Sequence, residues 1–134
     1  MRRSKPIRRR KAPLRRIRRN KYGVGLDEIS RDLRTYKGTE YHSKMEARYA
    51  AALDLRMRAV HPSFRIAGWK RQVPVKLEVN GKLVSTYIVD FVVTHTDGRL
   101  EYVEIKGLET PEWKIKEKLF RALFPDRKLT IVRN

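Results

Sequence analysis

Three charged residues, Asp90, Glu104 and Lys106, lie in segments that otherwise have the composition of buried β-strands. The segments are Y-I-V-D-F-V-V at residues 87–93 and L-E-Y-V-E-I-K at residues 100–106. An unpaired charge in such an apolar, β-branched run costs several kcal/mol unless an ion or another side chain compensates it. The pattern therefore predicts that these charges have a compensating partner.

The turn between the two strands decides whether the charges meet. Glu104 and Lys106 are two residues apart, so both side chains project from one face of the strand, roughly 6 to 7 Å apart. A two-residue turn would put Asp90 on the opposite face, whereas a three-residue loop at residues 96–98 sets Asp90 opposite Glu104. We predict the three-residue loop, with Gly98 in the left-handed conformation, or a compensating bulge.

The oxygens of these residues would form a hard, incomplete metal cage. Asp90, Glu104 and the backbone carbonyl of Ile105 suit Mg²⁺ or Mn²⁺, which retain waters and take further ligands from a phosphate. Lys106 can position or help deprotonate an attacking water and offset charge on the phosphorus oxygens. This is the chemistry of phosphodiester hydrolysis. The alternative is an edge hairpin with a surface Glu-x-Lys pair, since the pattern D-x(n)-E-x-K is short and common.

The sequence around these residues resembles the PD-(D/E)XK nuclease superfamily, with Val89 and Asp90 in place of P-D and E-I-K at 104–106. Residues 41–47 (YHSKMEA) are similar to F-x-S-K-x-E-A of phage-encoded Holliday-junction resolvases. Residues 106–120 are similar to their K-G-x-x-T-x-x-[WY]-x-x-K-x-K-L-F. The resemblance covers residues 36–132. It implies a restriction-endonuclease-like core and a magnesium-dependent endonuclease acting on four-way DNA junctions.

A helix predicted at about residues 44–60 carries a further acid, Glu46. Ser43 and Glu46 have the spacing of a capping box, so capping is one role for this acid. Glu46 also heads the core-facing line of the helix, and the resemblance implies that an acid here completes the metal site directly or through water. The two roles are compatible. His42 is a lesser candidate for substrate contact, with a local turn role as the alternative.

Gln72 is another lesser candidate, because members of the superfamily often carry a Gln near this position. A hairpin closed by Asn80 and Gly81 sets Gln72 opposite Val89, one residue out of phase with Asp90. Gln72 then faces away from the metal unless a bulge intervenes. A proline at position 74, which has no N–H to give a sheet, could mark such a bulge or a sheet edge.

The remaining elements follow from periodicity and capping signals. Strands are predicted at 66–79, 82–93, 100–107 and 128–132, with a helix from Pro111, capped by Thr110, to about residue 123. A helical crossover makes the last strand parallel to its neighbour. The predicted fold class is α/β, a mixed central sheet flanked by helices, with a basic N-terminal arm.

Charge is concentrated at the N-terminus. Of the net charge of +18 over 134 residues, residues 1–22 contribute 12 Lys or Arg and no acid. The rest carries +6, and this part is long enough for one domain with a modest core. The arm is predicted to be flexible and to bind DNA phosphates without reading sequence, with a solvated tail or a localisation signal as alternatives.

Residues 23–40 are predicted to form a short linker. Leu26, Ile29, Leu33 and Tyr36 have helical spacing, Asp27 can cap this helix, and Lys37 with Gly38 can end it. So short a helix must pack on the body or on a second subunit. We therefore divide the chain into a basic arm (1–22), a linker that could make a dimer contact (23–40) and a nuclease domain (41–134).

Several classes of protein are disfavoured. The chain lacks cysteine, which rules out disulfides and thiolate zinc sites and fits a cytoplasmic location, that of the host if the protein is phage-encoded. No apolar run approaches the roughly 18 to 20 residues of a membrane span. No phosphate-binding glycine loop or dinucleotide motif is present, so a nucleotide cofactor is not expected.

The expected partners are branched DNA and a second copy of the chain, because a four-way junction has approximate two-fold symmetry. The residues predicted to contact DNA are Arg8, Arg9, Arg10, Arg15, Arg16, Arg18, Arg19, Ser43, Lys44, Thr110, Lys114 and Lys116. Two alternatives remain open: a nuclease with another DNA target, such as a nicking, repair or transposon-end enzyme, and a non-catalytic basic nucleic-acid-binding protein.

Deleting residues 1–22 should weaken DNA binding and flatten its salt dependence, because the slope of log K against log salt falls by about 0.9 for every phosphate that the arm no longer neutralises. Fluorescence anisotropy over a salt series measures both quantities. An arm of equal length with its Lys and Arg changed to Ser separates charge from length. An unchanged slope in both variants would contradict the role assigned to the arm.

Overall fold

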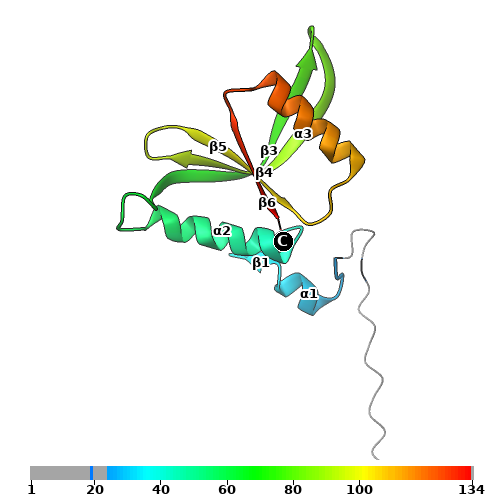
Figure 1. Cartoon of the computed structure of the whole chain (residues 1–134). Helices are drawn as coiled ribbons and strands as arrows, with labels where there is room; N and C mark the ends of the chain where they lie inside the picture. Colours follow the sequence, from blue (N-terminus) through cyan, green and yellow to red (C-terminus); the bar gives the residue numbers. More distant parts are fainter. Residues whose placement is uncertain (1–18, 20–23, 134) are drawn as a thin grey trace, which may run out of the picture.

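The computed structural model describes residues 19 and 24–133 (Figure 1). Its elements in order are α1 (Glu28–Asp32), β1 (Thr35–Tyr36), β2 (Thr39–Glu40), α2 (Lys44–Met57), β3 (Ile66–Val79), β4 (Lys82–His95), β5 (Leu100–Lys106), α3 (Pro111–Leu123) and β6 (Lys128–Arg133). The four long strands form one sheet in the order β3-β4-β5-β6, in which only β5 and β6 are parallel. The predicted α/β class with a mixed sheet is confirmed.

Two helices cover opposite faces of this sheet (Figure 1). Ala50 and Leu53 of α2 pack on one face in a cluster with Phe91 and Val93. Phe120 of α3 belongs to a second cluster on the other face. Because both faces are covered, the central strands carry nearly continuous apolar runs, and any charge in them lies close to the core.

The loop between β4 and β5 has the predicted form. The N–H of His95 donates to the carbonyl of Arg99 over 2.8 Å, and the N–H of Gly98 donates to the carbonyl of His95 over 2.9 Å. Gly98 has a φ of 88°, the left-handed conformation that the odd-length loop requires. This register, continued along both strands, sets Asp90 opposite Glu104.

The hairpin between β3 and β4 departs from the predicted register. Asn80 and Gly81 both have positive φ, as a two-residue turn of this kind requires, and Val79 pairs with Lys82. A register shift then follows between Leu77 and Glu78. The uninterrupted pairing predicted from the turn is therefore wrong beyond this point.

The shift brings Gln72 into phase with the charged residues. Val73 pairs with Val89, so Gln72 lies opposite Asp90 and not opposite Val89. Pro74 pairs in register and does not mark the bulge. It does lie in β3, an edge strand of the sheet, which is where a residue without an N–H is tolerated.

The helix predicted at residues 26–36 is shorter than expected. Asp27 caps α1 as predicted, with its Oδ1 accepting from the N–H of Ser30 over 2.9 Å. However, Tyr36 lies in a strand, and Lys37 and Gly38, with φ of 48° and 75°, form the turn between β1 and β2. Two successive residues with positive φ favour a hairpin over a helix end. Leu26, Ile29 and Leu33 consequently remain exposed.

Hydrogen bonds and an ion pair at Asp54 attach the β1–β2 hairpin to the rest of the fold. Asp54 of α2 accepts hydrogen bonds from the hydroxyl of Tyr36 over 2.7 Å and from Nε1 of Trp69 over 2.9 Å. Lys37 adds an ion pair at 2.8 Å. The hydrogen bonds from Lys37, Tyr36 and Trp69 lower the pKa of Asp54 to about 2. The hairpin therefore packs against α2, the helix whose first turn contributes to the site.

Candidate functional site

One pocket of about 640 Å³ collects the side chains predicted to do chemistry. They come from elements far apart in sequence: Glu46 from the first turn of α2, Asp90 from β4, and Glu104, Ile105 and Lys106 from β5. His42, immediately before α2, lines the same pocket. The pocket opens where β4 and β5 part, because their pairing ends at Phe91 and Val103.

Asp90 lies where strands β4 and β5 separate. Its Oδ2 accepts the backbone N–H of Ile105 over 2.8 Å, and Nε2 of Gln72 lies 3.4 Å from its Oδ1. Burial raises the pKa of Asp90 above its ordinary value, although the hydrogen bond from Ile105 and the charge of Lys106 oppose this shift. Oδ2 of Asp90 is thus hydrogen-bonded to the backbone, while Oδ1 lies near the side chain of Gln72.

Glu46 lies in the first turn of α2, next to the serine that caps the helix. The N–H of Glu46 donates to Oγ of Ser43 over 3.1 Å, which confirms the helix cap, and Oγ of Ser43 lies 3.3 Å from Oε1. Oε2 of Glu46 is buried and has no hydrogen-bond partner among the described residues, and Nδ1 of the exposed His42 lies 3.8 Å from it. Burial and the charge of Asp90 raise the pKa of Glu46 to about 7. The cap is therefore observed, and the position beside Asp90 leaves the second role, at a metal, as a prediction.

Glu104 and Lys106 form a contact on one face of β5, as their spacing predicted. Nζ of Lys106 donates to Oε1 of Glu104 over 3.2 Å. Oε2 of Glu104 is buried, and no hydrogen-bond partner for it is found in the part of the chain that the structure describes. Burial and the charge of Asp90 raise the pKa of Glu104 to about 7, against the effect of Lys106. One ammonium therefore does not compensate the acids that share the pocket.

The donor set suits a hard divalent cation. The available ligands are carboxylate oxygens, of which one on Glu46 and one on Glu104 are buried and lack a partner. A buried carboxylate oxygen without a donor is costly, and a cation would remove that cost. Among the residues that the structure describes, no group of three or more His, Cys, Asp or Glu forms a ready metal site. The metal site therefore stays a prediction that the pocket's chemistry favours.

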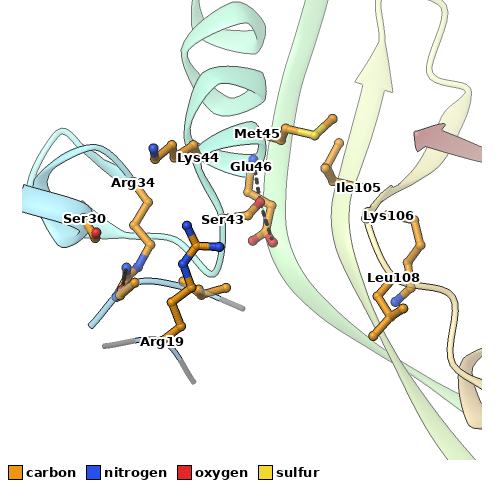
Figure 2. Close-up of a pocket in the computed structure, with 13 residues that line it drawn as sticks. Arg19, Ser30, Arg34, Ser43, Lys44, Met45, Glu46, Ile105, Lys106 and Leu108 are labelled. Atoms are coloured by element: carbon orange, nitrogen blue, oxygen red, sulfur yellow. Dashed lines mark hydrogen bonds between the residues drawn. The ribbon is translucent and has the colours of Figure 1, made fainter. Parts of the chain in front are cut away.

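A basic cleft of about 450 Å³ adjoins this pocket and shares Glu46 and Lys106 with it. Figure 2 shows Arg19 and Lys44 on one side of Glu46 and Lys106 on the other. Arg19, Ser43 and Lys44, all predicted to contact DNA, line the cleft. These cations lie where a phosphate backbone could enter beside the carboxylates.

A smaller cavity of about 250 Å³ lies on the α3 side of Lys106. Thr110 and Lys116, which were predicted to contact DNA, line it together with Glu104. Oγ1 of Thr110 accepts the N–H of Trp113 over 3.2 Å and caps α3 as predicted. Lys114 is exposed on the same helix. The remaining predicted DNA contacts, Arg8, Arg9, Arg10, Arg15, Arg16 and Arg18, lie outside the described residues.

Arg34 was missed by sequence reasoning. It is 5% exposed, pairs with Glu40 and donates to the carbonyl of Gly25, and it lines both larger pockets. The predicted helix would have placed this arginine on the surface. Trp113 and Tyr87, which lie beside Lys106, were also missed as site residues. The aromatic position of the resolvase-like motif was the available signal for Trp113.

Without divalent metal, the protein should lose stability as the pH rises from about 4.5 to about 7. The pKa of Glu46 is about 7 in the folded chain against an ordinary 4.5, so over this range the folded chain binds more protons than the unfolded chain. Glu46→Gln should reduce the loss by about 2 kcal/mol. Urea unfolding in chelator at pH 5 and pH 8 measures this. Glu78→Gln, at an exposed position, is the control; an unchanged pH dependence in Glu46→Gln would contradict the burial of this charge.

No helix in the described part of the chain has the length and apolar character needed to cross a membrane. Comparison with curated proteins and with solved structures finds no match. Residues 31–134 match a family model described as "Protein of unknown function (DUF1064)". This match spans most of the chain, including every element from β1 to β6. The chain therefore belongs to the DUF1064 family.

Proposed function

We propose that this protein is a magnesium-dependent endonuclease that hydrolyses phosphodiesters in branched DNA, with the four-way junction as its substrate. The observation that carries the proposal is the meeting of Glu46, Asp90 and Glu104 with Lys106 in one pocket beside a basic cleft. Structural ion pairs also bury charges, but they leave fewer oxygens unpaired than this pocket does.

The ligands of the proposed metal are Asp90 and Glu104, the backbone carbonyl of Ile105, and Glu46 directly or through water. When bound, Mg²⁺, or Mn²⁺ in its place, supplies an activated water and polarises the phosphate. The two buried glutamate oxygens without partners support this assignment, since they need a positive charge that the described residues do not provide in full.

The chain's own residues bind and orient the substrate. Lys106 can donate to an attacking water or to a phosphate oxygen in the pocket, where its charge offsets the charge that develops during hydrolysis. Arg19 and Lys44 can hold the backbone on the cleft side, and Lys116 can hold it on the side of α3. Contacts of this kind position the backbone without reading bases, which suits recognition of DNA shape.

The same proposal includes a homodimer and a cytoplasmic location. Resolution of a four-way junction requires two coordinated cuts, which a two-fold symmetric pair of active sites can deliver. Leu26, Ile29 and Leu33 are exposed apolar residues in or next to α1, the segment for which a dimer contact was predicted. A cytoplasmic location agrees with the absence of cysteine.

Asp90→Asn or Glu104→Gln should abolish magnesium-dependent cleavage of a labelled four-way junction, by at least about 100-fold, and leave junction binding intact. Both changes keep the shape of the side chain and remove the charge that would hold a cation. Asp126→Asn, at an exposed carboxylate remote from the pocket, is the matched control. Cleavage is measured with magnesium and with chelator, and binding by gel shift.

Cutting retained by either active-site variant would refute the metal role. Flaps, forks and plain duplexes assayed beside the junction distinguish the alternative DNA targets. Absence of magnesium-dependent cutting on every substrate would leave the interpretation as a non-catalytic nucleic-acid-binding protein.

The complex with one junction should contain two chains, and Ile29→Glu should weaken that pairing because it places a charge on the exposed apolar surface. Light scattering of the complex counts the chains. Ser63→Glu, at another exposed position, controls for added charge. One chain per junction in the wild-type complex would contradict the proposed dimer.

A further inference from the structure

Four side chains meet on the α3 side of the sheet, and we call them the Lys106 cluster: Tyr87, Glu104, Lys106 and Trp113. Nζ of Lys106 lies 4.8 Å from the ring centroid of Trp113 and 3.2 Å from Oε1 of Glu104. Nε1 of Trp113 donates to the hydroxyl of Tyr87 over 3.1 Å. Burial is the largest influence on the pKa of Glu104 and raises it, and the nearby Tyr87 hydroxyl opposes that rise. The contacts thus link Tyr87 to Trp113, Trp113 to Lys106 and Lys106 to Glu104.

The aromatic members of the cluster are rigidly held. Trp113 is 5% exposed and Tyr87 2% exposed, and both belong to the core cluster under α3. The N–H of Trp113 is bound by the capping hydroxyl of Thr110, which fixes the first turn of the helix. The indole therefore presents a fixed face to Lys106. The hydroxyl of Tyr87 also satisfies the buried indole N–H of Trp113, as an interior Trp usually requires.

The ammonium needs such support. A lysine side chain has four rotatable bonds and loses up to about 2 kcal/mol of conformational free energy when it is held in one position. A cation over an indole face gains about 0.5 to 2 kcal/mol, depending on how far it is desolvated. The contact with Trp113 can therefore offset most of the conformational free energy that Lys106 loses. The hydrogen bond to Glu104 sets the direction in which the ammonium points.

We propose that Trp113 and Tyr87 are positioning residues that hold the Lys106 ammonium and the Glu104 carboxylate in the geometry required for phosphodiester cleavage. The inference rests on the proposed nuclease function. Neither aromatic residue takes part in hydrolysis. Trp113 acts through the face of its indole, and Tyr87 acts through its hydroxyl, which accepts the indole N–H and so fixes the orientation of the ring over Lys106.

The test compares variants that separate the aromatic face from bulk packing. Trp113→Phe keeps an aromatic face and Trp113→Leu does not, although both leave space in the core. Single-turnover cleavage by Trp113→Leu should fall about tenfold relative to Trp113→Phe, which corresponds to the cation–π free energy. The junction Kd should change by less than about twofold, because neither variant alters Arg19, Lys44 or Lys116, the residues proposed to hold the phosphate backbone. Urea unfolding of both variants shows whether they are folded under the assay conditions.

Tyr87→Phe is a second, nearly isosteric variant that stays informative if Trp113→Leu does not fold. It removes the hydroxyl that accepts the Trp113 indole N–H, and single-turnover cleavage should fall about threefold to tenfold. Tyr102→Phe is the matched control, since Tyr102 belongs to the same buried cluster and packs on Phe120. It should cleave within about twofold of the wild type.

A readout that does not depend on activity is the NMR signal of the Lys106 ε-methylene in protein labelled at lysine. Protons over an indole face are shifted upfield. The shift should be present in the wild type and in Trp113→Phe and absent in Trp113→Leu, with exposed Lys114 as the internal reference.

A wild-type Lys106 signal at the position of Lys114 would overturn the proposal, as would equal cleavage by Trp113→Phe and Trp113→Leu. An upfield signal in a wild-type protein that cuts no DNA would instead overturn the nuclease function, and the catalytic meaning of the cluster with it, while the contact itself would stand.

Discussion

The compensation of buried negative charge is the constraint on which the rest of this structure depends. In the antiparallel pairing of β4 with β5, His95 and Arg99 form a hydrogen-bonded pair, and such pairs recur at every second residue. A regular ladder would therefore pair Val89 with Ile105 and direct the N–H of Ile105 to the carbonyl of Val89. That N–H is taken instead by the carboxylate of Asp90. The Asp90 carboxylate keeps the N–H of Ile105 hydrogen-bonded while β4 and β5 separate, and the pocket lies where they separate. Charge and fold are therefore linked, because the residue that ends the ladder is one of the acids that the pocket must accommodate.

The described residues compensate the buried charges of Glu46 and Glu104 only in part. One oxygen of Glu46 lies near the helix-capping Ser43, and one oxygen of Glu104 accepts from Lys106. The other oxygen of each glutamate is buried and has no donor within residues 19 and 24–133. An ordinary core would not retain such groups, since apolar residues of similar volume cost less. Retention of three acids around one ammonium has a simple explanation if a cation and a phosphate complete the site. The basic cleft beside Glu46 and Lys116 on α3 would supply positive charge for the phosphate backbone of the proposed substrate.

Local signals predicted the parts of the fold that local chemistry decides. The odd-length loop with Gly98, the Asn80–Gly81 turn and the Thr110 cap each follow from backbone geometry that few residues allow, and the structure confirms them. The register shift at Leu77 had no such signal, because a bulge depends on packing across strands, and it moved Gln72 next to Asp90. The helix predicted at residues 26–36 was wrong in extent for a related reason. Helical spacing of its apolar residues was outweighed by two residues with positive φ and by burial of Arg34, neither of which periodicity reports. Tyr87 was likewise not predicted as a site residue, since its proposed role depends on a hydrogen bond with Trp113, which is 26 residues away in the chain.

The central claim is that carboxylates from α2, β4 and β5 bind one divalent cation within reach of Lys106. A crystal structure determined with manganese, using its anomalous scattering, tests this most directly. The account predicts an anomalous peak coordinated by Asp90 and Glu104, with Glu46 bound directly or through water. A clear map without such a peak, in which these three carboxylates point separately into solvent, would contradict it.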